Sequence, residues 1–267
     1  MTDLVVWGGP VYTTTLDKVQ WKRPTRVWAH PLEGQSNAVF WEQLKATGDP
    51  LGSILKMAKV TEYPSAIGAA GFSAAHEFLS DLVGAVGDKI QYLQLCDSCF
   101  QGAGAVKGKP GYTSYARLAA AGKVRMVVTS NGPWGKNISY SGGTEGKYAG
   151  VQFNLTSGSL CVANFVRDAF GGDLEPITLD VPPEVPQPER MFRKGEFYWF
   201  AYNERTMKDP HGDHANVLAA PYMQMYGAPW LGGERGLSSS APNALAMALG
   251  AAAGAYAARY VMKKAGY

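Results

Sequence analysis

Short runs of β-forming residues alternate with stretches of helical spacing along most of this chain. The strand candidates are residues 4–7, 25–29, 65–70, 90–96, 123–129 and 195–202. Helical spacing is found at 38–59, with a break near Gly48–Pro50, and at 74–86, 115–121 and 215–226. Because alternating strands and helices build a parallel sheet with crossover helices, the sequence predicts an α/β fold with a mainly parallel central sheet flanked by helices.

The chain divides by composition near residue 231. Residues 1–231 predict one α/β domain, within which 134–190 is rich in Gly, Ser and Pro and reads as an irregular insertion containing a helix at 160–170. Residues 232–240 predict a linker, and 241–262 an Ala/Gly-rich helix, so that 232–267 forms a separate C-terminal segment.

Composition excludes several classes of protein. The 267 residues are 46% hydrophobic and 18% charged, which is incompatible with intrinsic disorder. No basic run exceeds Lys263–Lys264, so nucleic acid is not an expected partner. Cys96 and Cys99 have C-x-x-C spacing, but three cysteines supply neither a second pair for zinc nor a disulfide framework. No metal or organic cofactor is implied.

The N-terminus begins Met1-Thr2-Asp3-Leu4 and has neither a charged nor an apolar leader segment. No signal peptide is therefore expected, and synthesis in the cytoplasm is the expectation for localisation.

A serine lies between a strand candidate and a helix candidate, in Gly71-Phe72-Ser73-Ala74-Ala75. A serine on a sharp strand-to-helix turn projects from the carboxyl edge of the sheet, and small neighbours allow the two backbones to approach. This is the geometry of the nucleophile elbow G-x-S-x-G. The present sequence matches that motif except that Ala75 replaces the last glycine.

Candidates for a base and an acid follow the serine in the chain. Asp97 comes directly after the next strand candidate, and His211 and His214 follow the last one. We favour His214 over His211 as the base, because a helix beginning there would fix its backbone. His30 and His76 are assigned no catalytic role, and Asp168, Asp173 and Asp180 are alternative acids.

The order of these elements resembles that of the α/β-hydrolase-fold serine hydrolases, which include esterases. His30-Pro31-Leu32-Glu33-Gly34 resembles the family's oxyanion loop, and Asp213-His214-Ala215-Asn216 its closing histidine segment. The resemblance implies a carboxylic-ester or amide hydrolase that works through an acyl-enzyme. Ser73 would be the nucleophile, His214 the base and Asp97 the acid, with the backbone N–H groups of Ala74 and Leu32 as oxyanion donors.

Two other functions remain open at this point. Pro31 and Ala75 stand where the family has glycine, which favours a catalytically inactive, hydrolase-like scaffold that acts as an assembly subunit. Gly34-Gln35-Ser36-Asn37 resembles the nucleophile block of the SGNH hydrolases. That group has a late Asp-x-x-His segment, which this chain lacks.

The expected partners follow from the aromatic residues and from the tail. Trp134, Tyr140 and aromatic residues within 197–230 suggest a small-molecule, glycan or lipid ester as substrate. Gly250 and Gly254 have the G-x-x-x-G spacing of close helix packing. We expect the tail helix to pack on another subunit in a homo-oligomer or larger assembly, in preference to spanning a membrane, because it contains few large apolar residues.

Overall fold

The computed structural model describes residues 2–9, 16–29, 37–100, 108–132, 137–141, 152–156, 158–171, 174–203, 205 and 207–233. All of them belong to the unit Met1–Gly233. The expected tail helix at 241–262 lies outside the described residues. In the described part of the chain, no helix combines the length and the hydrophobicity that a membrane crossing requires.

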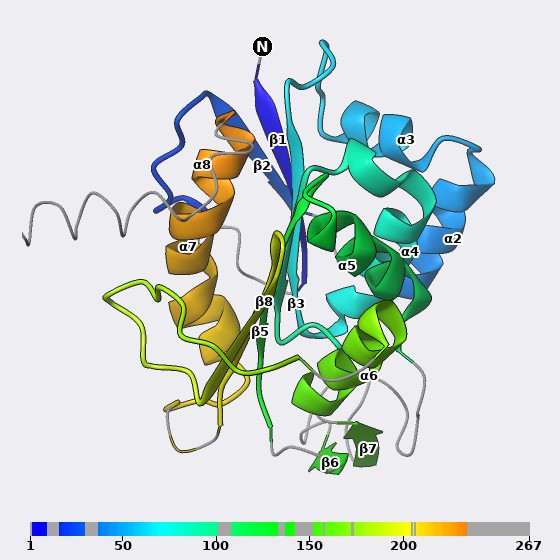
Figure 1. The fold of residues 1–267 in the computed structure, drawn as a ribbon. Helices are drawn as coiled ribbons and strands as arrows, with labels where there is room; N and C mark the ends of the chain where they lie inside the picture. The colour runs from blue at the N-terminus through cyan, green and yellow to red at the C-terminus, as the bar shows by residue number, and fades with distance from the viewer. Residues whose placement is uncertain are drawn as a thin grey trace, which may run out of the picture. The chain divides into compact units, whose positions relative to one another are not determined.

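The centre of the fold is a seven-stranded sheet in the order β2-β1-β3-β4-β5-β9-β8 (Figure 1). Its parallel strands are β1 (Asp3–Gly8), β2 (Thr25–Ala29), β3 (Ile67–Phe72), β4 (Tyr92–Cys96), β5 (Arg125–Ser130) and β9 (Phe197–Ala201). The edge strand β8 (Arg190–Lys194) runs antiparallel to β9. The predicted α/β class with a mainly parallel sheet is confirmed.

Helices cover both faces of this sheet (Figure 1). One face packs against α2 (Asn37–Ala46), α3 (Pro50–Met57), α4 (His76–Val86), α5 (Pro110–Ala120) and α6 (Gly158–Phe170). The other packs against a continuous helical stretch made of η3 (His214–Leu218), α7 (Ala219–Tyr222), η4 (Met223–Gly227) and α8 (Ala228–Leu231). Two short 3₁₀ turns, η1 (Ser73–Ala75) and η2 (Gly87–Lys89), flank α4.

The central strands are buried on both faces, as expected of a covered parallel sheet. In β1, Leu4 and Val6 belong to the core under α2–α6, while Val5 and Trp7 belong to the core under the C-terminal helical stretch. β4 alternates in the same way. The period of two therefore assigns side chains to two separate cores.

Part of segment 134–190, interpreted from the sequence as an insertion, belongs to the main fold. Helix α6 contributes Cys161, Val162, Phe165 and Val166 to the core. Strands β6 (Asn137–Ser141) and β7 (Gln152–Thr156) form a separate antiparallel pair.

The strand order reverses beside Ser73. From β1 the chain moves to β2 on one side and then returns past β1 to β3 on the other. In open α/β sheets, ligands bind outside the carboxyl ends of the strands, at the point where the strand order reverses. Here that point lies between β1 and β3, and Ser73 follows β3 directly.

Candidate active site

Ser73 occupies a strained turn between β3 and α4. Its φ is +54°, in the left-handed region that non-glycine residues rarely adopt, and the residue is half-buried. Its carbonyl oxygen accepts a hydrogen bond from the Ser98 hydroxyl at 3.0 Å and one from Nδ1 of His76 at 3.2 Å. These two hydrogen bonds fix the backbone of the turn. Neither uses the Ser73 hydroxyl, which is therefore available for another partner.

Small residues make this turn possible. A Cβ atom at Gly71 would lie 2.6 Å from a Leu79 methyl group, 2.7 Å from the Ala75 Cβ and 2.8 Å from the Gly8 carbonyl oxygen. Ala75 is fully buried, and its Cβ would be 3.0 Å from a Cβ placed at Gly8. Alanine therefore fits at the fifth position of the elbow, because glycines lie on both sides of it.

His211 connects the serine to a carboxylate. Its Nε2 lies 3.0 Å from Ser73 Oγ, and its Nδ1 lies 2.7 Å from Asp97 Oδ2. The expected convergence of Ser73, a histidine and Asp97 is therefore present in the structure. Its histidine is His211, which the sequence analysis ranked second.

The His211 ring is held from several directions. The Phe72 ring lies 4.5 Å from it, centroid to centroid, and Phe100 makes an edge contact at 5.5 Å. Its loop is folded by Asp209, whose carboxylate accepts the backbone N–H groups of His211 (3.3 Å) and Gly212 (3.0 Å). The His211 side chain remains 32% exposed and so is accessible from solvent.

The His214 ring forms no hydrogen bond with Ser73, which corrects the preferred assignment. The residue is fully buried, and its Nδ1 lies 2.8 Å from the Thr129 hydroxyl. Burial lowers the pKa of His214 from 6.5 to about 4, an effect only partly opposed by Asp97. The helical stretch that begins at His214 fixes the backbone as expected, but it turns this ring into the core.

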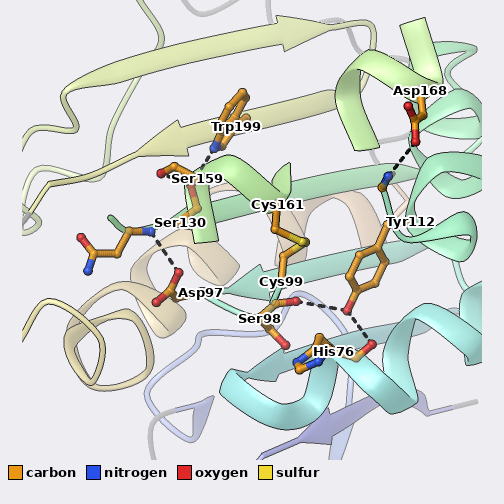
Figure 2. The surroundings of a disulfide bond; sticks show 12 residues. His76, Asp97, Ser98, Cys99, Tyr112, Ser130, Ser159, Cys161, Asp168 and Trp199 are labelled. Carbon is orange, nitrogen blue, oxygen red and sulfur yellow. Dashed lines mark hydrogen bonds between the residues drawn. A yellow bond between two sulfur atoms is a disulfide. The ribbon is translucent and has the colours of Figure 1, made fainter. Parts of the chain in front are cut away.

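Asp97 is held as a buried acceptor at the end of β4. Its residue is 3% exposed, and its backbone N–H donates to the Thr129 carbonyl at 2.8 Å. Oδ1 accepts the backbone N–H of Asn131 at 3.0 Å (Figure 2). A Cβ at Gly158, the first residue of α6, would lie 2.1 Å from the same oxygen. The positive end of the α6 dipole stabilises a carboxylate there.

The segment that carries Asp97 is also tied to α6 by a disulfide. Cys99 pairs with Cys161 of α6, and both cysteines are buried (Figure 2). The Tyr112 hydroxyl donates to the Ser98 carbonyl at 3.2 Å. This disulfide is not expected from three cysteines at these spacings. Cys96, the other half of the C-x-x-C spacing, is a buried free cysteine whose pKa burial raises to about 12.

The other residues predicted for the site either are not members of the hydrogen-bonded group Ser73, His211 and Asp97, or lie outside the described residues. Ala74 is exposed and follows Ser73 directly in η1. Leu32 and the rest of 30–36 are outside the described part of the chain, as is Asp173. Of the alternative acids, Asp168 accepts the Gly108 backbone N–H, and the Asp180 carbonyl accepts the Tyr226 hydroxyl. Neither contact involves the site.

Most of the aromatic residues expected at a cleft fill the core instead. Trp199 belongs to the core under α2–α6, and Tyr198, Tyr222, Tyr226 and Trp230 belong to the core under the C-terminal stretch. In the described part of the chain, the rings of Phe72 and Phe100 lie beside His211. Within the described residues, no group of His, Cys, Asp or Glu side chains has an arrangement that could hold a metal ion.

The fold and site thus define an α/β protein with a Ser–His–Asp arrangement at the carboxyl edge of a parallel sheet. No protein-family model matches the sequence, and searches of curated proteins and of solved structures find no match. A functional assignment therefore rests on the geometry itself.

Proposed function

We propose that this protein is a serine hydrolase that cleaves an ester, or an amide, through the triad Ser73–His211–Asp97. The observation that carries the proposal is the position of His211, with one ring nitrogen 3.0 Å from Ser73 Oγ and the other 2.7 Å from Asp97 Oδ2. A nucleophile bonded to a base that is itself oriented by a third group is the signature of an activated serine.

The hydrogen-bond directions suit general-base catalysis. Ionised Asp97 accepts the His211 Nδ1–H, which leaves the lone pair of Nε2 facing the Ser73 hydroxyl. His211 then takes the Ser73 proton as Oγ bonds to the substrate carbonyl carbon. Collapse of the tetrahedral intermediate breaks the bond to the leaving group, which receives that proton. Water, activated by His211, releases the acid and restores Ser73.

The backbone supports the same assignment. The chain order Ser, Asp, His is that of α/β-hydrolases, and the elbow φ of +54° at Ser73 matches their exposed nucleophile. In such an elbow, the N–H of the residue after the nucleophile, here Ala74, stabilises the oxyanion. Asn131 follows β5, where a triad acid is more usual, and here its N–H supports Asp97.

Turnover of a soluble p-nitrophenyl ester tests the proposal. Ser73→Ala and His211→Gln should each lower kcat by roughly 10³-fold or more, the scale of losses from a triad. Ser36→Ala is the matched control, because it removes the serine of the competing Gly-Gln-Ser-Asn motif. Equal turnover by Ser73→Ala and the wild type would refute the triad, and loss only in Ser36→Ala would favour the SGNH interpretation.

A further inference from the structure

His214 is a buried histidine that the proposed reaction does not use. Its ring is fully buried, and its Nε2 has no hydrogen-bond partner among the described residues. Burying a polar atom without a partner costs free energy. A leucine or phenylalanine would fill the same core position without that cost, so the contacts of the other ring nitrogen need an explanation.

The other ring nitrogen reaches the strand that supports the triad acid. The Thr129 hydroxyl donates to the Leu95 carbonyl at 3.3 Å and therefore accepts the Nδ1–H of His214 at 2.8 Å. This direction requires a hydrogen on Nδ1. The pKa of about 4 that burial gives His214 keeps the ring neutral near pH 7.

Thr129 itself lies behind Asp97. Its carbonyl oxygen accepts the Asp97 backbone N–H at 2.8 Å, and two residues later Asn131 N–H donates to the Asp97 carboxylate at 3.0 Å. The end of β5 thus fixes both the backbone and the side chain of the acid. A shift of Thr129 would move Asp97 with it.

His214 also contacts the loop of the triad base. Its backbone N–H donates to the His211 carbonyl at 3.2 Å, three residues earlier in the chain. One residue therefore joins the loop that carries the base to the strand that holds the acid. The two contacts use different parts of His214, its backbone and its ring.

We propose that His214 and Thr129 form a positioning pair, which holds the His211 loop in register with the end of β5 and so sets the bond between His211 and Asp97. This inference rests on the proposed hydrolase function. His214 exchanges no proton with substrate in this role. It acts through the placement of His211, which explains why a histidine with a donating Nδ1–H is present in the core.

Paired substitutions separate positioning from packing. Thr129→Val removes the hydroxyl and keeps the side-chain volume, whereas Thr129→Ser keeps the hydroxyl. His214→Phe fills the site without the donor, whereas His214→Asn places an amide donor near the position of Nδ1. Tyr115→Phe is the control for stability, because it removes a buried hydroxyl that donates to the Ile90 carbonyl at 2.7 Å, on another part of the sheet.

We expect Thr129→Val and His214→Phe to lower kcat for ester turnover by roughly tenfold with KM nearly unchanged, less than the ~10²-fold loss that a misplacement of about 1 Å can cause. Thr129→Ser and His214→Asn should retain most of the activity. The double variant Thr129→Val/His214→Phe should lose no more than either single variant, because both remove the same hydrogen bond. Tyr115→Phe should lower the melting temperature and leave kcat unchanged.

The low-field proton resonance of His211 Nδ1–H gives a second measurement, which is independent of turnover. It should shift or broaden in Thr129→Val and His214→Phe and stay unchanged in Tyr115→Phe. Wild-type kcat in both disrupting variants would overturn the inference. If the wild-type protein shows no Ser73-dependent turnover, the proposed function fails, and an unshifted resonance in both variants would then refute the positioning pair separately.

Discussion

Two residues of the site adopt backbone conformations that are unfavourable by themselves. Ser73 has φ +54° and Asp97 has φ +44°, and each such conformation costs about 1–3 kcal/mol for a non-glycine residue. Both are fixed by several hydrogen bonds, which for Asp97 come from its backbone and from its side chain. The surrounding structure therefore imposes the geometry of Ser73 and Asp97, the two residues that the proposed mechanism uses as nucleophile and acid.

The buried imidazole of His214 predicts a specific dependence of stability on pH. Its folded pKa of about 4 lies below the ordinary value of 6.5, chiefly because burial disfavours the charged ring. Between these pH values the unfolded chain binds a proton that the folded chain does not. The contribution of the neutral His214 ring to the free energy of unfolding is therefore fully present above pH 6.5. It decreases as the pH falls through the folded pKa, by roughly 3 kcal/mol in total.

Urea unfolding at pH 7 and pH 4.5 measures this effect. His214→Asn should lose less stability over this interval than the wild type, although His76, whose pKa burial also lowers to about 4, contributes a similar decrease in both proteins. An identical loss in the variant and the wild type would show that His214 is not held neutral by burial.

The choice between His211 and His214 shows where the sequence was informative about the site. The elbow predicted the position of Ser73, and the end of the next strand predicted that of Asp97. For the histidine, however, the predicted helix start favours His214 as the base, and the structure has His211 at that position. His214 lies on the same helical face as Leu218 and Tyr222, both buried, and that spacing of four indicates a core position. His211 precedes the helical stretch in a turn, where its ring can reach the site.

At the scale of elements, helix α6 completes the environment of the acid. Its N-terminus abuts Asp97, and the Ser159 backbone N–H donates to the Asn131 carbonyl at 3.1 Å. Ser159 Oγ lies 3.0 Å from Ser130 Oγ, which accepts the Trp199 indole N–H (Figure 2). This buried network fixes the start of α6 against the end of β5 and the middle of β9.

Gly158 is therefore predicted to be intolerant of any side chain. Gly158→Ala would place a methyl group 2.1 Å from Asp97 Oδ1, and the carboxylate would have to move away from its position beside His211. We expect kcat to fall by roughly 10-fold or more, while the helix itself is preserved because alanine is a better helix former than glycine.

Gly52→Ala is the matched control for this prediction. It creates the same kind of conflict in the first turn of α3, where a Cβ would lie 2.0 Å from an Asp49 carboxylate oxygen. Its effect should be limited to the cap of α3, with no change in turnover. Similar kcat values for Gly158→Ala and the wild type would contradict the role assigned to α6.

The elements that sequence patterns predicted were those with clear local signals. The six parallel strands and the helices α2–α4 lie close to their expected positions, because short apolar runs bounded by turn residues mark the strands and helical spacing marks the helices. Helix α5 begins at Pro110, five residues before its expected start. β8 was missed because its residues Arg190–Lys194 are mostly polar, as suits an edge strand. The sequence feature that could have predicted β8 is Gly195, which follows it. The φ of Gly195 is +58°, which allows the tight turn into β9. The role of α6 depends on tertiary contacts that no local pattern shows.

At the scale of the whole molecule, the Cys99–Cys161 disulfide joins segments that are 62 residues apart. The sequence did not reveal this pair, because Cys96 and Cys99 are close neighbours and Cys161 is remote. The end of β4 places Cys96 and Cys99 in different cores. Cys96 packs in the core under the C-terminal stretch, whereas Cys99 lies past the strand end in the core with α6.

Loss of this disulfide should destabilise the fold. The double variant Cys99→Ala/Cys161→Ala is expected to lose roughly 2–5 kcal/mol of unfolding free energy, as for other disulfides that close long loops. A reductant should lower the melting temperature of the wild type and of Cys96→Ala, but not that of the double variant. A wild-type protein equally stable with and without reductant would contradict the pairing.

In the proposed mechanism, Ser73 lies where the strand order reverses between β1 and β3 and acts as a nucleophile activated by His211. Reaction with a fluorophosphonate, followed by mass spectrometry of the digested protein, tests it most directly, since the probe forms a covalent bond with an activated serine. We expect one added phosphonyl group, on the peptide that contains Ser73, and its loss in Ser73→Ala and His211→Gln but not in Ser36→Ala. A folded wild-type protein that remains unlabelled, or a label on a serine other than Ser73, would contradict it.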